Sequence, residues 1–300
     1  MVLANRNAHL AGCIVLNAFL AVMAPCDERP NSAVRYGRPH KVADLQSEAI
    51  AESSGVAASH RHADIYWTHN DSGDAARLFA FDRSGTVRGQ CRLPGVTALD
   101  WEDMASFTRA GQPWLIVADV GDNGRRRTTC TLHLFPEPDI GETEVVPWSL
   151  EFCYSDGAHD CESVGVDGVA GVILLVTKVW GDQCDVFQLP LPTSAPPTKA
   201  TATLLSRIAV PLATAMDVSS DGRHAIVGTY TDGYLFERAG PDSWEQAFAR
   251  APVRVPFPLR RQGEAVCFRH GSLTLLLTSE RAPAPLWEIV HGEPPAALPR

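Results

Sequence analysis

Short apolar runs with alternating polarity recur along this chain from about residue 48, and almost no helical periodicity accompanies them. Glycine, proline, asparagine and aspartate separate the runs, as is typical of β-strands joined by turns. So many short strands at this spacing indicate a sandwich, a barrel or a propeller. The clearest runs are 64–68, 77–81, 114–118, 172–177, 225–229 and 273–278.

Internal repetition favours the propeller. A carboxylate opens a strand of small residues five times, roughly 50 residues apart, and an apolar strand and an aromatic strand follow each time. Each unit is interpreted as a four-stranded blade. The openings are Glu52, Glu102, Glu162, Asp217 and Glu264.

The fifth unit runs out of chain after its third strand, near Val290. A segment from His40 to Leu45 is expected to supply the missing outer strand and close the ring, which removes exposed sheet edges. We therefore predict an all-β fold, a single β-propeller over residues 48–300. Five four-stranded blades are expected, with six as the alternative.

The first 26 residues are interpreted as a leader. Arg6 precedes an apolar run at 10–24 that suits a signal peptide better than a membrane span. Cys26 leaves lipid anchoring open as an alternative. Residues 27–47 are assigned to a linker and the closing strand, and the mature protein is expected outside the cytoplasm, periplasmic, secreted or lipid-anchored.

Composition narrows the possible partners. The formal net charge is −9, so the basic surface that nucleic-acid binding requires is missing. Six cysteines remain after the leader, an even number that suits disulfide formation in an oxidising compartment. Cys153 and Cys161 flank a turn and are the first candidate bridge, while buried free thiols are the alternative.

Antiparallel geometry brings carboxylates together at one mouth of the predicted ring. The first strand of each blade begins where the second strand ends, so the opening residues and the turns after the second strands share one face. Oxygen ligands of this kind suit calcium better than zinc. Alternatively, these side chains accept hydrogen bonds from the backbone of neighbouring blades. The predicted ligands are Glu52, Glu102, Glu162, Asp217, Glu264 and Asp119, with Asp71, Asp103 and Asp122 nearby.

Cationic and basic side chains are predicted at the same face. Lys178 and Arg281 are candidates to stabilise negative charge, and Asp71 or Asp122 to orient an attacking water. His69 is a candidate base or ligand, or alternatively the cap of a turn. The arginines at 125–127 are read as a solvated loop or as an anion contact. The His-Arg-His sequence at 60–62 is expected to bind nothing.

Five stretches together resemble a family of exported bacterial β-propeller proteins, over about residues 48–290. They are Glu52-Ser53-Ser54-Gly55, the run 69–74, Asp100-Trp101-Glu102-Asp103, the run 119–123 and Gly263-Glu264-Ala265. The arrangement is also similar to that of calcium-activated nucleotidases, five-bladed propellers with a calcium in the channel. That resemblance implies calcium and hydrolysis of an ester or anhydride. The fourth unit departs from the pattern, because Met216-Asp217 stands at its opening.

Together, these features predict an exported, calcium-dependent hydrolase of a phosphoester, phosphoanhydride or related anionic ester. The alternative is a non-enzymatic propeller with a structural metal that recognises a glycan or an envelope protein. A small anionic substrate or a glycan is the expected partner. We expect a monomer that binds no nucleic acid and meets a membrane only through a lipid anchor.

Overall fold

The computed structural model describes residues 36–194 and 199–292. The predicted leader, with Cys13 and Cys26, lies outside these residues. Contacts group Val34–Arg300 as one unit, and only this unit is described below. Apart from one short helix, α1 (Trp244–Phe248), its regular structure is β-strand. None of the helices in the described residues has the length and hydropathy of a membrane span.

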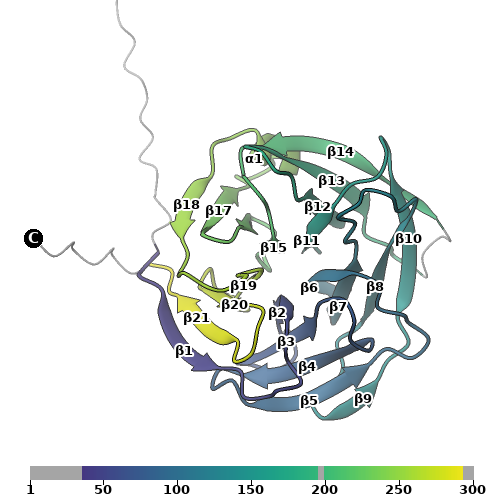
Figure 1. The fold of residues 1–300 in the computed structure, drawn as a ribbon. Helices are drawn as coiled ribbons and strands as arrows, with labels where there is room; N and C mark the ends of the chain where they lie inside the picture. Colours follow the sequence, from purple (N-terminus) through teal and green to yellow (C-terminus); the bar gives the residue numbers. More distant parts are fainter. Residues whose placement is uncertain (1–35, 195–198, 293–300) are drawn as a thin grey trace, which may run out of the picture. The chain divides into compact units, whose positions relative to one another are not determined.

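The 21 strands of the described residues form four hydrogen-bonded sheets (Figure 1). Three of these sheets are small, and the fourth has eight strands. The first half of the strands comprises β1 (His40–Asp44), β2 (Ser53–Ala58), β3 (Ile65–Asn70), β4 (Arg77–Asp82), β5 (Val87–Arg92), β6 (Trp101–Arg109), β7 (Gln112–Asp119), β8 (Cys130–Pro136), β9 (Glu142–Glu144) and β10 (Trp148–Tyr154). The second half comprises β11 (Cys161–Asp167), β12 (Val172–Thr177), β13 (Cys184–Pro190), β14 (Ala200–Ile208), β15 (Ala215–Val218), β16 (His224–Gly228), β17 (Asp232–Glu237), β18 (Val253–Pro256), β19 (Ala265–Phe268), β20 (Leu275–Thr278) and β21 (Pro285–Ile289).

Antiparallel pairing dominates each sheet. The strand orders are β2-β3-β4-β5-β9, β15-β16-β17-β18 and β1-β21-β20-β19 for the small sheets. In the eight-stranded sheet, β6-β7-β8-β10 and β11-β12-β13-β14 are joined by the parallel pair β10–β14. A nearly all-β chain with several small sheets in this order is consistent with a β-propeller.

The segment expected to supply an outer strand does pair with the end of the chain. Strand β1 lies antiparallel to β21, with His40 opposite Glu288 and Asp44 opposite Pro285. This pairing covers the edge of β21, which would otherwise expose unpaired backbone groups.

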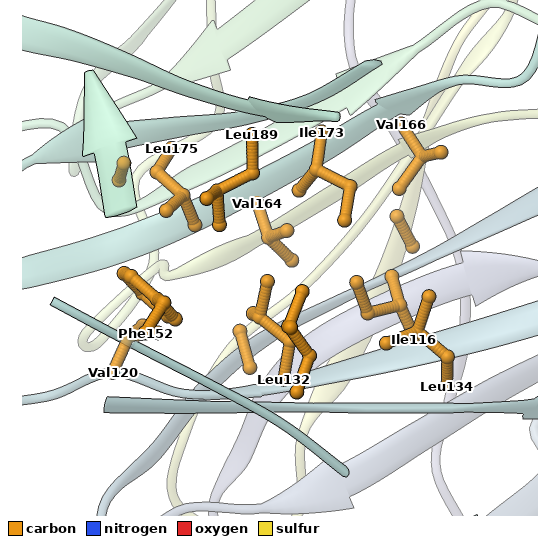
Figure 2. Packing of buried hydrophobic residues seen from close by; sticks show 14 of the residues in the cluster. Ile116, Val120, Leu132, Leu134, Phe152, Val164, Val166, Ile173, Leu175 and Leu189 are labelled. Atoms are coloured by element: carbon orange, nitrogen blue, oxygen red, sulfur yellow. The ribbon is translucent and has the colours of Figure 1, made fainter. Parts of the chain in front are cut away.

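The first strands of the groups, β2, β6, β11, β15 and β19, lie side by side around a common centre (Figure 1). Apolar side chains fill the space between neighbouring groups. Figure 2 shows one such layer, where Ile116 and Leu132 face Val164 and Ile173. Successive residues of a strand join different apolar clusters, as Val56 and Ala57 do, so both faces of the sheets are buried against a neighbour.

The expected disulfide between Cys153 and Cys161 is not formed, and that prediction is wrong. All six cysteines of the described residues are free thiols. Cys153 lies on β10, beside Ala200 and Thr201 of β14, and is partly exposed. Cys161 lies on β11 and is fully buried, where its thiol donates to the carbonyl of Val176 at 3.3 Å. The two side chains have different surroundings, because Cys161 belongs to an apolar cluster between sheets whereas Cys153 lies at the partly exposed pair β10–β14.

Candidate metal centre

Three carboxylates converge where β3 ends and β6 begins. Asp71 follows β3, Asp100 precedes β6, and Glu102 is the second residue of β6. One oxygen from each lies within 4.8 Å of the others. We call these residues the carboxylate triad. Glu102 is 6% exposed and the other two are partly buried, so the group is sheltered but reachable from solvent.

A β-bulge aims Glu102 at this position. The register of β6 against β7 shifts between Trp101 and Asp103, which leaves Glu102 as the extra residue. The same irregularity occurs at Glu162 in β11. Bulges of this kind redirect side chains and are frequent beside functional sites. In this chain they direct two glutamates of adjacent first strands to the same end.

The backbone of the turn after β7 comes very close to the triad. A Cβ at Gly121 would lie 2.2 Å from Oε1 of Glu102 and 2.4 Å from Oδ2 of Asp100. Only glycine therefore allows the turn after β7 to approach these carboxylates so closely. In addition, Oδ1 of Asp71 is buried without a hydrogen-bond partner.

Calcium fits this donor set. The ligands are hard oxygens, and calcium–oxygen distances of about 2.3–2.6 Å allow ligand oxygens to stand up to about 5 Å apart. The triad falls inside that limit. A bound cation would also satisfy the orphaned oxygen of Asp71, and a buried acceptor without a partner is costly.

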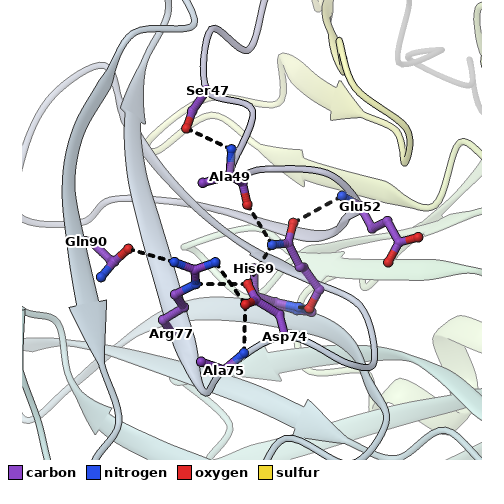
Figure 3. Close-up of polar contacts among 9 residues, drawn as sticks. Ser47, Ala49, Glu52, His69, Asp74, Ala75, Arg77 and Gln90 are labelled. Carbon is purple, nitrogen blue, oxygen red and sulfur yellow. Dashed lines mark hydrogen bonds and ion pairs between the residues drawn. The ribbon is translucent and has the colours of Figure 1, made fainter.

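A hydrogen-bond network holds the turn that carries Asp71 (Figure 3). The amide nitrogen of Asn70 donates to the carbonyl of Ala49 at 2.8 Å and to Asp74 at 2.6 Å. Asp74 in turn accepts two bonds of 2.9 Å from Arg77. The backbone of Glu52 donates to Oδ1 of Asn70 at 3.1 Å. Asn70 and Asp74 thus fix the turn that presents Asp71 to the triad.

Burial, and then the charges of neighbouring carboxylates, raise the pKa values of the triad. Burial raises the pKa of Asp71 to about 6, and the charges of Asp100, Glu264 and Glu52 add to this. Burial likewise raises the pKa of Asp100 and, with Glu162 and Asp71, that of Glu102. Each carboxylate therefore resists ionisation next to the others until a positive charge is supplied.

A second cluster lies beside the triad, and we call it the lysine network. Lys178 Nζ contacts both carboxylate oxygens of Glu162 at 2.5 Å and lies 3.9 Å from Glu264. The hydroxyl of Tyr230 donates to Glu264 at 2.8 Å. Glu280 completes the group, and its carboxyl shares a hydrogen bond with that of Glu264.

Burial controls protonation in the lysine network as well. It raises the pKa of Glu162 to about 8, although Lys178 lowers it. It raises the pKa of Glu280 to about 9, with a further contribution from Glu264. With such a pKa, Glu280 remains protonated at neutral pH and can donate a proton.

Two further acids point into the centre instead of the mouth. Asp103 accepts bonds from the backbone of Met104, Val164 and Met216 at 2.8, 2.9 and 3.0 Å. Asp217 accepts from Val218 at 2.9 Å and from Phe268 at 2.8 Å. We call this pair the central carboxylates. They satisfy backbone groups of first strands from other sheet groups.

Asp217 is therefore the counterpart of Asp103, not of Glu102. Both aspartates bond the backbone N–H of the next residue and of a first strand further round. Met216 stands directly before Asp217, at the position that Glu102 has before Asp103. The backbone-bonding alternative holds for Asp217, because both of its oxygens already have N–H partners.

Asp119 and Asp122 serve the turn after β7. Arg127 lies 2.7 Å from Oδ1 of Asp119, and the backbone of Leu99 donates to Oδ2 at 3.0 Å. Asp122 accepts from the backbone of Arg127 at 2.7 Å. These bonds position Gly121 and leave Asp122 committed to the turn. The neighbours of Arg127, at 125 and 126, are exposed.

The remaining predicted residues are not members of the triad. His69 is fully buried, donates from Nδ1 to the carbonyl of Asn70 at 2.9 Å, and has a pKa lowered by burial to about 4. Arg281 is exposed and bonds Gln262 at 2.7 Å. Glu52 is exposed at the rim and pairs through its backbone with Glu280.

Sequence reasoning did not propose Asp100, Tyr230 or Glu280 as site residues. Asp100 was visible within the Asp100-Trp101-Glu102-Asp103 stretch, where three acids crowd into four positions. Glu280 was visible in a turn after a second strand. Tyr230 had no comparable indication, because a lone tyrosine in a turn is common.

Comparisons with known proteins leave this site to be interpreted from its own residues. No protein-family model matches the sequence, and no curated protein matches it. Among solved structures, a gluconolactonase from Xanthomonas campestris is similar to the chain with a TM-score of 0.47 and 11% identity, over 86% of each chain.

Proposed function

We propose that the carboxylate triad binds calcium and that the protein is a calcium-dependent hydrolase of an anionic ester. The observation that carries this proposal is the convergence of Asp71, Asp100 and Glu102 within 4.8 Å, with a buried oxygen of Asp71 left without a partner. Calcium bound there would supply Lewis-acid polarisation of an ester oxygen and activation of a water.

The neighbouring residues supply the other functions that such a reaction needs. Glu280, protonated at neutral pH, would give a proton to a leaving alkoxide. Tyr230 holds Glu264 at 2.8 Å and keeps that carboxylate oriented toward Glu280. The exposed arginines 125 and 126, on the turn after Gly121, would attract an anionic substrate. Lys178 neutralises Glu162 and so limits the negative charge beside the triad.

The wider architecture is part of the proposal. We infer five blades, because the strand order divides into five antiparallel groups of four, with β9 added to the first. We also propose that the protein acts outside the cytoplasm, on the strength of the apolar run at 10–24. Fractionation of cells that carry the full chain with a C-terminal reporter tests the second point.

A structural calcium in a binding propeller is the second candidate. Both cationic side chains predicted to stabilise negative charge already have partners, since Lys178 pairs with Glu162 and Arg281 bonds Gln262. This favours a site without catalysis. In that case the partner would be a glycan or an envelope protein, and turnover would be absent.

Hydrolysis of a panel of phosphomonoesters, phosphodiesters, nucleoside diphosphates and lactones, with calcium and with EGTA, tests the first candidate. Calcium-dependent turnover of one class, reduced at least a hundredfold in Asp100→Asn, is the expected result. Asp182→Asn is the matched control, because Asp182 is an exposed acid on a turn of the same face, the one that follows β12. Calcium binding without turnover on the panel favours the structural calcium, and an absence of calcium binding contradicts both candidates.

A further inference from the structure

A cavity lies at the end of the first strands opposite the triad. Its volume is about 380 Å³, and its lining comes from the turns where β2, β6, β11, β15 and β19 end. The triad instead lies where β6 begins. Glu102 and Thr108 are six positions apart on β6, which is roughly 20 Å at about 3.3 Å per residue. The two sites are therefore distinct.

Two histidines from distant parts of the chain meet at this cavity. His60 follows β2, and His270 follows β19. Their ring centroids are 4.2 Å apart, and the ring planes are inclined at 43°. The pair joins the first and last sheet groups of the described chain.

His60 is held in one orientation. Its Nδ1 lies 3.1 Å from the hydroxyl of Thr108, at the end of β6. With Nδ1–H donated to Thr108, the lone pair of His60 is on Nε2. Metal-binding histidines are commonly oriented in this way by a partner of the second ring nitrogen.

The surroundings select against a charged organic ligand. The lining combines imidazoles and hydroxyls with apolar walls, and no aspartate, glutamate, lysine or arginine of the described residues is part of it. The lining residues that matter are His60, Thr108, Ser219, Ser220 and His270.

The ring geometry fits a shared metal ion. At a metal–nitrogen distance of about 2.1 Å, each imidazole centroid stands roughly 3.2 Å from the ion. Centroids 4.2 Å apart then correspond to two ligands at close to a right angle, the cis arrangement of copper(II) and nickel(II) sites. The cavity leaves room for waters as the other ligands.

We propose that this cavity is a second metal site, which binds a divalent transition-metal ion of the copper, nickel or zinc class through His60 and His270. Thr108 acts as a positioning residue, and Ser219 and Ser220 face the remaining coordination positions through water. Nitrogen donors prefer such ions, whereas the oxygen donors of the triad prefer calcium.

Copper(II) provides the sharpest test. The untagged full chain, stripped with EDTA, is titrated with copper(II) by calorimetry in the presence of excess calcium, and the complex is examined by electron paramagnetic resonance. We expect one tight equivalent whose spectrum shows superhyperfine coupling to imidazole nitrogen. His270→Ala should weaken binding at least tenfold and reduce the nitrogen coupling, and Thr108→Val should weaken it by a smaller factor.

His62→Ala is the matched control, since His62 lies on the same turn as His60 with its side chain 33% exposed. Its copper affinity should equal that of the unmodified chain. Thermal melts identify any variant that fails to fold, and the exposed His270 provides a variant with little effect on the core. A spectrum without nitrogen coupling, or equal losses in His62→Ala and His270→Ala, would overturn the proposal.

Discussion

Glu102 and Asp103 are adjacent in the sequence, yet the carboxylate triad and the central carboxylates have opposite surroundings. Asp103 and Asp217 accept five backbone N–H bonds between them. The triad contains an oxygen with no partner at all. The same chemical group is structural where the chain supplies donors. Where the chain supplies only other carboxylates, it is available to a cation.

Strand register produces this difference. The bulge at Glu102 turns that residue to the mouth and leaves Asp103 facing the centre. Strand β15 pairs with β16 without a bulge. The acid of β15, Asp217, occupies the central position. A shift of one residue exchanges the two faces of a strand. An alignment that matches acids alone therefore pairs Asp217 with Glu102, although its counterpart is Asp103.

Removal of a central carboxylate should have the largest effect on stability. Asp103→Ala leaves three buried N–H groups unpaired, at about 1–3 kcal/mol each, so we expect the free energy of unfolding to fall by about 3 kcal/mol or more. Urea denaturation measures it. Asp103→Asn retains one acceptor oxygen and should lose less. An Asp103→Ala variant as stable as the unmodified chain would contradict the structural role.

Removal of a triad carboxylate should not lower the stability of the calcium-free protein. In EGTA, Asp100→Asn and Glu102→Gln should leave the melting temperature unchanged or raise it, because a repelling charge is lost. Calcium at a hundred times its dissociation constant should stabilise the unmodified chain by about 2.7 kcal/mol. The two variants should lose most of this gain. Thermal melts with and without calcium decide it, and equal gains in all three proteins would exclude the triad as ligand.

The close approach of Gly121 to the triad allows a finer test. Gly121→Ala places a Cβ against Glu102 and Asp100, so we expect calcium affinity to fall at least tenfold in calorimetry. Gly124→Ala, on the same turn, is the control, since its nearest neighbour would be at an ordinary 3.4 Å from the Cβ. If both substitutions weaken calcium binding equally, the effect belongs to the turn as a whole and not to the close approach at Gly121.

A pH series should give the smallest effect. Asp71, Glu162 and Glu280 have pKa values of about 6, 8 and 9, raised mainly by burial above those of an unfolded chain. The folded state thus holds protons more tightly, and its stability should fall as pH rises from about 5 to 9. We expect melting temperatures in EGTA to drop by several degrees across that range. Saturating calcium should reduce the drop, whereas a rise with pH would contradict the raised pKa values.

Much of the fold was visible in the hydrophobic pattern. The alternation of apolar and polar positions predicts the all-β class, and the segment from His40 was expected to pair with the last strands, as β1 does with β21. Both follow from local periodicity and from the need to cover sheet edges. The candidate site was visible in part, since Asp71 and Glu102 were singled out and Asp100 was not.

The sequence by itself determined where the strands recur and that acids stand at the beginning of the first strand of each unit. Only the tertiary structure decided which acids meet backbone donors and which meet one another, because this depends on bulges and on contacts between separate strands. It also paired His60 with His270, which are 4.2 Å apart by centroid but far apart in the sequence. Periodicity in the sequence indicates which face of a strand a residue lies on. Which residues of other strands it contacts depends on how the sheets pack against one another.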